Sequence, residues 1–207
     1  MTFKIRPVHI SDIPEVAKIY LSYFSHRLNN IIEARYKFYF LQDYLILHLI
    51  LNKESFWVVE INKQIIGYII APLSNRQVHL LSLLKWLLTV FKHILQGKYG
   101  IPFNLICIFI KNRGSLYRNP LAKSLRKFPH IYSIALKKEF QQKGLGTQLV
   151  TMALHKHAKN GYLRSWLSVE SRNQKAINFY KKLGYKEIGR RDEFLFMMKD
   201  LSKNIIG

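Results

Sequence analysis

Two glycines separated by one residue, Gly144 and Gly146, lie between an apolar run that ends at Leu136 and a helix-like run that begins at Thr147. A glycine loop at such a junction exposes backbone amides at the positive end of a helix dipole, which favours phosphate binding. Glycine also lets a ligand approach the main chain closely and tolerates a positive φ. The dinucleotide fingerprint needs a third glycine, and the Walker loop needs Gly-Lys-Ser/Thr; the segment has neither. The loop alone therefore predicts either a tight turn or a phosphate site.

A second group of polar and aromatic residues follows one helix-like and one strand-like segment further along the chain. The order and spacing are Gln/Arg-x-x-Gly-x-Gly/Ala, then an asparagine, an alanine, Phe-Tyr and Gly-Phe/Tyr. The residues that carry this pattern are Gln141, Gln142, Lys143, Gly144, Leu145, Gly146, Asn173, Ala176, Phe179, Tyr180, Gly184 and Tyr185. On these motifs the chain resembles the GNAT superfamily of acetyl-CoA-dependent N-acetyltransferases. The segments "IRPVHISDIPEVAKIY" and "IIGYIIA" resemble the opening strand and helix and the third strand of that family.

The resemblance implies an acetyl-CoA site at the glycine loop. The backbone of one strand would pair with the pantetheine arm, and the amides that follow it would hold the pyrophosphate. The implied cofactor-binding residues are Ile134, Ala135, Leu136, Gln141, Gln142, Lys143, Gly144, Leu145, Gly146, Thr147 and Asn173. The residue pattern itself agrees with this implied site, because a strand edge beside a helix N-terminus suits a phosphorylated ligand.

The resemblance also implies catalytic roles. Tyr180 matches a tyrosine that often acts as the acid, and a phenol within reach of the departing sulfur could protonate it. A backbone amide near Leu136 would stabilise the charge on the carbonyl oxygen. The alternative for Tyr180 is an aromatic side chain packed on the sheet. Asn173 could contact the cofactor or cap the helix that begins there.

The general base is not identified by the sequence. His130, Tyr132 and Ser133 lie on the strand that would face the acceptor, and Glu170 ends the next strand. Because side chains alternate along a strand, either His130 and Tyr132 or Ser133 can face the site without a bulge. The choice among the four stays open.

Composition narrows the remaining function classes. Lys and Arg number 33 against 12 Asp and Glu, and the net charge of +21 attracts polyanions. The basic residues are scattered and match no nucleic-acid-binding motif, so nucleic acid is not the expected partner. His155 and His157 lack the helical spacing of metal ligands, and Cys107 is the single cysteine, so we expect neither a metal nor an internal disulfide. The N-terminus lacks the apolar core of a signal peptide, which predicts a cytoplasmic protein.

The elements that must position these residues follow from periodicity. Strands are predicted at 3–8, at 55–73 as a pair joined by a turn at Asn62-Lys63, and at 130–137, 162–170, 185–190 and 193–200. Helices are predicted at 11–24, 31–51, 147–161 and 173–184. Gly67 inside a strand marks a bulge or a close backbone approach. We predict one α/β (α+β) domain over 1–207 with the GNAT fold, a mixed and mostly antiparallel sheet flanked by helices.

Residues 75–128 are predicted to form an atypical insertion between the third and fourth strands. Helix 77–97 has a polar stripe, and Lys85 and Lys92 interrupt its apolar residues, so no uncharged run suffices to span a membrane. It is predicted to be buried on several sides within the fold, or else to lie at a membrane interface or a homodimer contact. Residues 101–110 are predicted to form a buried strand or a buried helix, and residues 111–120 a basic loop.

The predicted activity is transfer of an acetyl group from acetyl-CoA to a primary amine in a ternary complex. We expect the acceptor to be a small molecule or an amino sugar. Two alternatives remain open. One is a protein N-terminal or lysine acetyltransferase, and the other is a non-catalytic acyl-CoA-binding sensor or interaction module.

Overall fold

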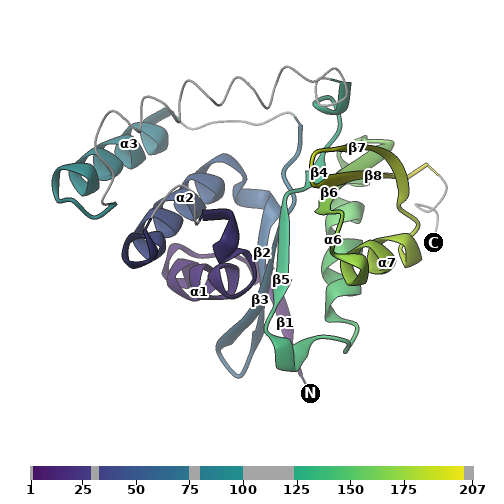
Figure 1. Ribbon diagram of the computed structural model, residues 1–207, viewed down its shortest axis with the longest axis horizontal. Helices are drawn as coiled ribbons and strands as arrows, with labels where there is room; N and C mark the ends of the chain where they lie inside the picture. Colours follow the sequence, from purple (N-terminus) through teal and green to yellow (C-terminus); the bar gives the residue numbers. More distant parts are fainter. Residues whose placement is uncertain (1, 29–32, 75–79, 100–123, 203–207) are drawn as a thin grey trace.

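The computed structural model describes residues 2–28, 33–74, 80–99 and 124–202, and the strands of this part form two four-stranded sheets (Figure 1). The first sheet has the order β1-β2-β3-β5, with β1 (Lys4–Pro7), β2 (Phe56–Ile61), β3 (Gln64–Ile70) and β5 (Ser133–Leu136). The second has the order β4-β6-β8-β7, with β4 (His130–Ile131), β6 (Arg164–Glu170), β8 (Phe194–Asp200) and β7 (Lys186–Arg191). Among the strands of the described residues only β4 and β6 pair in parallel, so the predicted mixed, mostly antiparallel arrangement is confirmed.

The two sheets part at one residue. The sequence predicts a continuous strand over 130–137, but the structure divides it at Tyr132 into β4, which pairs with β6, and β5, which pairs with β3. The amide of Tyr132 donates to the carbonyl of Ile70 at 2.8 Å, so the chain crosses to β3 at this point. Beyond Tyr132, β5 and β6 belong to different sheets, and a gap opens between them (Figure 1).

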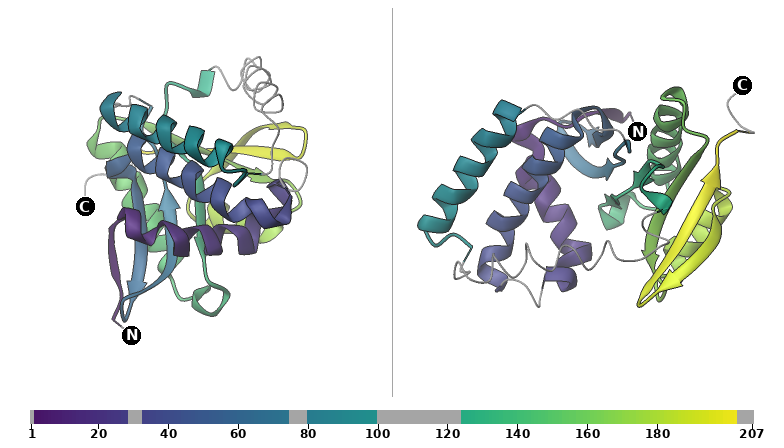
Figure 2. Two further views of the ribbon diagram at one scale, coloured as in Figure 1. Left: turned by 90° about the vertical axis from the view of Figure 1, so that its left-hand side faces the viewer. Right: turned by 90° about the horizontal axis from the view of Figure 1, so that it is seen from above.

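Helices cover the sheets in layers. Helices α1 (Ile13–Phe24) and α2 (Lys37–Leu51) pack on one face of the first sheet, and α3 (Leu80–Leu95) lies outside α2 (Figure 2). Helix α6 (Leu145–Lys159) lies on the other side of this sheet, and α7 (Gln174–Lys182) packs with it and with the second sheet. Each helix layer has its own core. Helices α6 and α7 therefore pack beside the gap through a different set of buried side chains from those of α1 and α2.

Local sequence features fix the register of the first sheet. Asn62 and Lys63 both adopt positive φ, 48° and 63°, in the predicted two-residue turn between β2 and β3. The register then shifts next to Gly67, as the glycine predicts. A Cβ added at Gly67 would overlap Cδ2 of Leu136 and lie 2.9 Å from the carbonyl oxygen of Ala135. Glycine is therefore required for β5 to approach β3.

Three helix starts differ from the predictions by two or more residues. Helix α2 begins at Lys37 rather than at residue 31, after a 3₁₀ turn at Ala34–Tyr36. Helix α1 begins at Ile13 rather than at residue 11, after a 3₁₀ turn at Ile10–Asp12. Helix α6 begins at Leu145, two residues before the predicted start. The predicted segments 101–110 and 111–120, and Cys107, lie outside the described residues.

Candidate functional site

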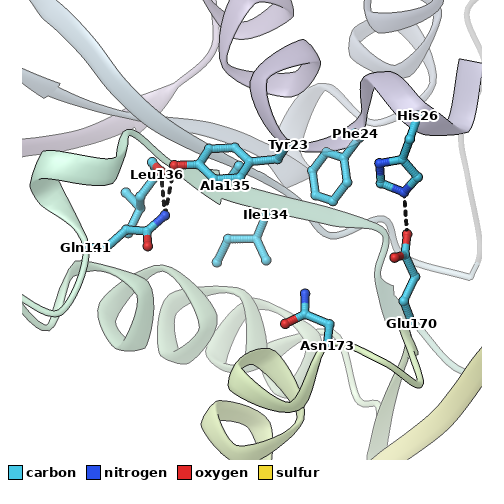
Figure 3. A pocket seen from close by; sticks show the side chains of 9 residues that line it. All are labelled: Tyr23, Phe24, His26, Ile134, Ala135, Leu136, Gln141, Glu170 and Asn173. Carbon is cyan, nitrogen blue, oxygen red and sulfur yellow. Dashed lines mark hydrogen bonds and ion pairs between the residues drawn. The ribbon is translucent and has the colours of Figure 1, made fainter.

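A cavity of about 180 Å³ lies where the two sheets part (Figure 3). It is bounded by the end of α1 and the turn after it, by β5, and by the junction of β6 with α7. Its lining residues are Tyr23, Phe24, His26, Ile134, Ala135, Leu136, Gln141, Glu170 and Asn173. The fold thus brings five of the predicted cofactor residues to one cavity, namely Ile134, Ala135, Leu136, Gln141 and Asn173.

One edge of β5 faces this cavity. In an antiparallel ladder, residues alternate between hydrogen-bonded and non-hydrogen-bonded pairs. The amide of Lys137 donates to the carbonyl of Ile66 at 2.8 Å, so Lys137 belongs to a hydrogen-bonded pair. Counting back by twos, residues 135 and 133 also direct their backbone amide and carbonyl groups toward β3. The backbone groups of Ile134 and Leu136 therefore point away from β3, toward the gap. This edge can pair with an extended polar chain as an added strand would.

The glycine loop begins the next helix. Gly144 is the N-cap of α6 with φ of 77°, and Gln142 also has a positive φ, 61°. No atom lies within 4 Å of a Cβ added at Gly144, so the space there is open. The first amides of α6 have no acceptor within the helix and carry its positive dipole end. The loop and the edge of β5 together fit a ligand that joins a phosphate group to an extended amide arm.

Gln141 joins the cavity walls. Its side-chain nitrogen donates to the hydroxyl of Tyr23 at 2.9 Å and to the carbonyl of Leu136 at 3.1 Å, and its oxygen accepts from Lys175 at 3.3 Å. Burial and the nearby carboxylate of Glu139 raise the pKa of Tyr23, against the hydrogen bond from Gln141. The Tyr23 hydroxyl therefore stays neutral. One glutamine thus ties α1, β5 and α7 together.

Of the four candidate bases, Glu170 alone lines this cavity. His130 stacks on Trp166 with ring centroids 4.8 Å apart, and the Ser133 hydroxyl is buried against that of Tyr68 at 2.8 Å. The Tyr132 hydroxyl bonds to the Tyr44 hydroxyl on the surface of α2.

The carboxylate of Glu170 is only 12% exposed and lies at the end of the cavity away from Gln141 (Figure 3). One of its oxygens is 2.9 Å from Nε2 of His26, and the other accepts from Nε of Arg172 at 3.1 Å. Both partners help to keep this carboxylate oriented at the cavity. A carboxylate that is largely removed from water and fixed in place is suited to accept a proton.

Asn173 is the N-cap of α7, and Tyr180 lies within this helix. The side-chain oxygen of Asn173 accepts from the amide of Ala176 at 3.0 Å, so the predicted cap is confirmed, and the same side chain lines the cavity. Tyr180 is buried at 7% exposure, with its ring 5.1 Å from that of Phe179 and 5.7 Å from that of Tyr185. It lies in the core beside α6 and is not among the lining residues, so its acid role stays a prediction.

Three lining residues were missed by the sequence analysis. Tyr23 and Phe24 end α1 and His26 lies in the 3₁₀ turn that follows, and the helical pattern there explains only the packing of the two aromatic residues. The sequence feature that could have indicated these residues is the change from apolar side chains to a histidine where α1 ends. Their role depends on contacts with residues more than a hundred positions away, such as Gln141 and Glu170.

Comparison with known proteins identifies the family. The model of the acetyltransferase (GNAT) family matches residues 14–185, most of the chain. The chain belongs to the GNAT acetyltransferase family. GNAT enzymes take their acetyl group from acetyl-CoA, so this protein is an acetyl-CoA-dependent N-acetyltransferase. The alternative of a non-catalytic sensor is thereby set aside.

Several GNAT relatives cover nearly the whole chain. An N-alpha-acetyltransferase from Sulfurisphaera tokodaii is 24% identical over 188 residues, 90% of this chain and 81% of the relative. The PaiA N-acetyltransferase from Thermoplasma acidophilum, solved in complex with coenzyme A, has a TM-score of 0.60 at 16% identity, over 97% of this chain and 99% of that chain. Ard1 from Thermoplasma volcanium has a TM-score of 0.61 at 16% identity, over 97% and 98%. These structures share the GNAT fold.

Proposed function

We propose that this GNAT enzyme transfers the acetyl group of acetyl-CoA to the α-amino group of a polypeptide N-terminus. The observation that carries the proposal is the relative named N-alpha-acetyltransferase, which is similar to this chain over 90% of its length. The solved structure of Ard1 has the same fold. This acceptor is the alternative that the sequence analysis left open, and the comparisons favour it over the small molecule or amino sugar that the sequence analysis preferred.

The size of the cavity agrees with such an acceptor. Pockets that enclose a small-molecule ligand commonly measure about 300–1000 Å³. The cavity here measures about 180 Å³ and must also admit the reactive end of the donor. That space suits the terminal amine of a chain whose remaining residues lie outside, more than it suits a sugar enclosed on all sides.

The donor site is proposed at the edge of β5 and the start of α6. Acetyl-CoA supplies a thioester whose carbonyl carbon is open to attack by an amine. The backbone of Ile134 and Leu136 would bind the pantetheine arm, and the amides from Gln142 to Thr147 would bind the pyrophosphate. An amide of β5 that points into the gap can also donate to the carbonyl oxygen where negative charge develops.

Two side chains would move the protons. Glu170 would take one from the acceptor ammonium, directly or through one water, which leaves the nitrogen lone pair able to attack. The C–N bond forms as the C–S bond breaks, and the electron pair leaves on sulfur. Tyr180 would give its proton to that sulfur, so that CoA departs as the free thiol. The attacking nitrogen then loses its second proton, directly or through water, to the Tyr180 phenolate, which restores the phenol and leaves the neutral amide.

An acceptor screen tests the proposal. The purified chain is given acetyl-CoA with peptides that carry free N-termini, with the same peptides blocked at the N-terminus but bearing lysine, and with amino sugars. Release of free thiol is followed in each case. We expect release with the free N-termini and little with the other two sets. Faster release with amino sugars or with lysine side chains would reject the N-terminal acceptor and leave the GNAT assignment intact.

A further inference from the structure

Helix α3 presents an apolar face to solvent. None of its residues is buried, although it is among the most apolar segments of the chain. The prediction that this helix is buried on several sides is therefore wrong for its described part. Seven large apolar side chains are 47–75% exposed, namely Leu80, Leu81, Leu84, Leu87, Leu88, Phe91 and Leu95. We call these seven residues the α3 apolar face.

The seven residues form one continuous stripe. At 3.6 residues per turn they fall within an arc of about 120° of the helix circumference. Lys85 and Lys92 come next to this arc on one side, and α3 contains no acidic residue. The helix thus combines an exposed apolar stripe with a basic border, which is the pattern of helices that lie in a membrane interface.

The opposite side of α3 is fixed to α2 through Asp43. The indole of Trp86 donates to the carbonyl of Asp43 at 2.7 Å, and Nδ1 of His93 lies 2.6 Å from its carboxylate. The hydroxyl of Tyr99, just beyond the helix, donates to the same carboxylate. Among the described elements, α2 is the main contact of α3, and α3 forms the outermost layer on this side (Figure 2). These bonds hold the helix with its apolar face outward.

We propose that the α3 apolar face docks the enzyme on the surface of a bilayer that contains anionic phospholipid. Leucine and phenylalanine side chains would enter the acyl boundary while Lys85 and Lys92 meet phosphate headgroups. The net charge of +21 adds a long-range attraction to such a surface. None of the described helices is long and apolar enough to cross a membrane, so the contact is peripheral. This inference concerns binding and is independent of the acceptor proposed above.

A second copy of the chain fits this face less well. In a two-fold contact the same patch meets itself, and where two α3 helices pack antiparallel, Lys85 and Lys92 lie on the same side as the equivalent lysines. Like charges brought together at an interface oppose association. Anionic headgroups instead complement both lysines, and the acyl boundary of a bilayer takes up the exposed leucine and phenylalanine side chains.

Liposome flotation with the full chain tests the proposal. We expect co-flotation with phosphatidylcholine vesicles that contain about one-third phosphatidylglycerol, and weaker binding to phosphatidylcholine alone. The triple variant L84Q/L88Q/F91Q should lower the partition coefficient by at least about tenfold, because each buried apolar side chain contributes to partitioning. The variant S82Q/T89Q changes two positions of the same helix outside the apolar face, and it should bind as the wild type does.

A second variant tests the electrostatic part without touching the apolar residues. K85Q/K92Q should reduce the preference for anionic over neutral vesicles, as should salt near 1 M, where the Debye length is only about 3 Å. Failure of the wild-type chain to float with anionic vesicles would overturn the proposal. So would flotation of L84Q/L88Q/F91Q at the wild-type level. A dimer in solution that this triple variant disrupts, without any vesicle binding, would assign the face to a second copy instead.

Discussion

Replacing Gly146 by alanine separates the stability of α6 from its role in binding the donor. A Cβ at this position would lie 3.5 Å from Cζ of Phe179 and 3.7 Å from Cδ1 of Leu136, which are ordinary contacts. Gly146 has no positive φ, and alanine favours a helix over glycine by up to about 1 kcal/mol. We therefore expect Gly146→Ala to leave the melting temperature unchanged or to raise it by up to about 2–4 °C.

The same methyl group would lie at the start of α6 and project toward Leu136 of β5, and we place the donor between these two elements. A phosphate or pantetheine group displaced by this methyl loses at least one hydrogen bond, and bonds to charged groups contribute about 1.5–3 kcal/mol each. The affinity for acetyl-CoA should then fall by at least about tenfold. The substitution is thus expected to stabilise the free enzyme and weaken the complex.

Thermal melting with and without acetyl-CoA measures both effects. At a hundred times its Kd, a ligand stabilises the folded state by about 2.7 kcal/mol, and a tenfold loss of affinity leaves about 1.4 kcal/mol. The shift caused by acetyl-CoA should therefore be about half as large in Gly146→Ala as in the wild type. Thr151→Ala, an exposed position further along α6, is the matched control and should keep the full shift. An unchanged acetyl-CoA shift in Gly146→Ala would refute the placement of the donor at the start of α6.

Three further predictions concern the fold and the catalytic groups. Gly67→Ala should lower the free energy of unfolding in urea by about 1–3 kcal/mol, because the added Cβ overlaps Leu136; a wild-type value would show that β5 can move. His157 is fully buried, and burial lowers its pKa from 6.5 to about 4, so the unfolded state binds its proton first as pH falls. Stability should be complete above pH 6.5 and decline toward pH 4 by up to about 3 kcal/mol. The dependence of stability on pH should be weaker in His157→Gln. An unchanged dependence would show that His157 is not its cause. Glu170→Gln and Tyr180→Phe should each lower kcat about a hundredfold or more and alter opposite limbs of its pH profile; an unchanged kcat in either variant removes that residue from the proton transfers.

The elements at which we place the donor could be predicted from the sequence because their features are local. The positive φ of Gly144, the start of α6 and the cap that Asn173 provides are properties of short segments. Each follows from the residue types and their immediate neighbours. The spacing between the two motifs is also a property of the linear chain, and it was enough to suggest the family.

The identity of the side chains that we place near the acceptor depends on long-range contacts, which the spacing of residues along the chain does not encode. The break at Tyr132 moves the strand from one sheet to the other, and it leaves Glu170 at the cavity while Ser133 and His130 pack elsewhere. Tyr23 meets Gln141 across 118 positions of sequence. Which of several plausible side chains reaches the cavity is decided by how strands pair and where a sheet divides, and these are long-range choices.

Helix α3 shows the same division. Its sequence determines that it is a helix and that one side carries polar groups and the other leucines, because both follow from a period of 3.6 residues. The sequence does not determine which side is covered, since burial depends on the neighbours that tertiary folding brings. Asp43 of α2 holds the side that carries Trp86 and His93, and this contact turns the leucines toward solvent. Periodicity reports the character of a face, and only packing against α2 decided which face of α3 is exposed.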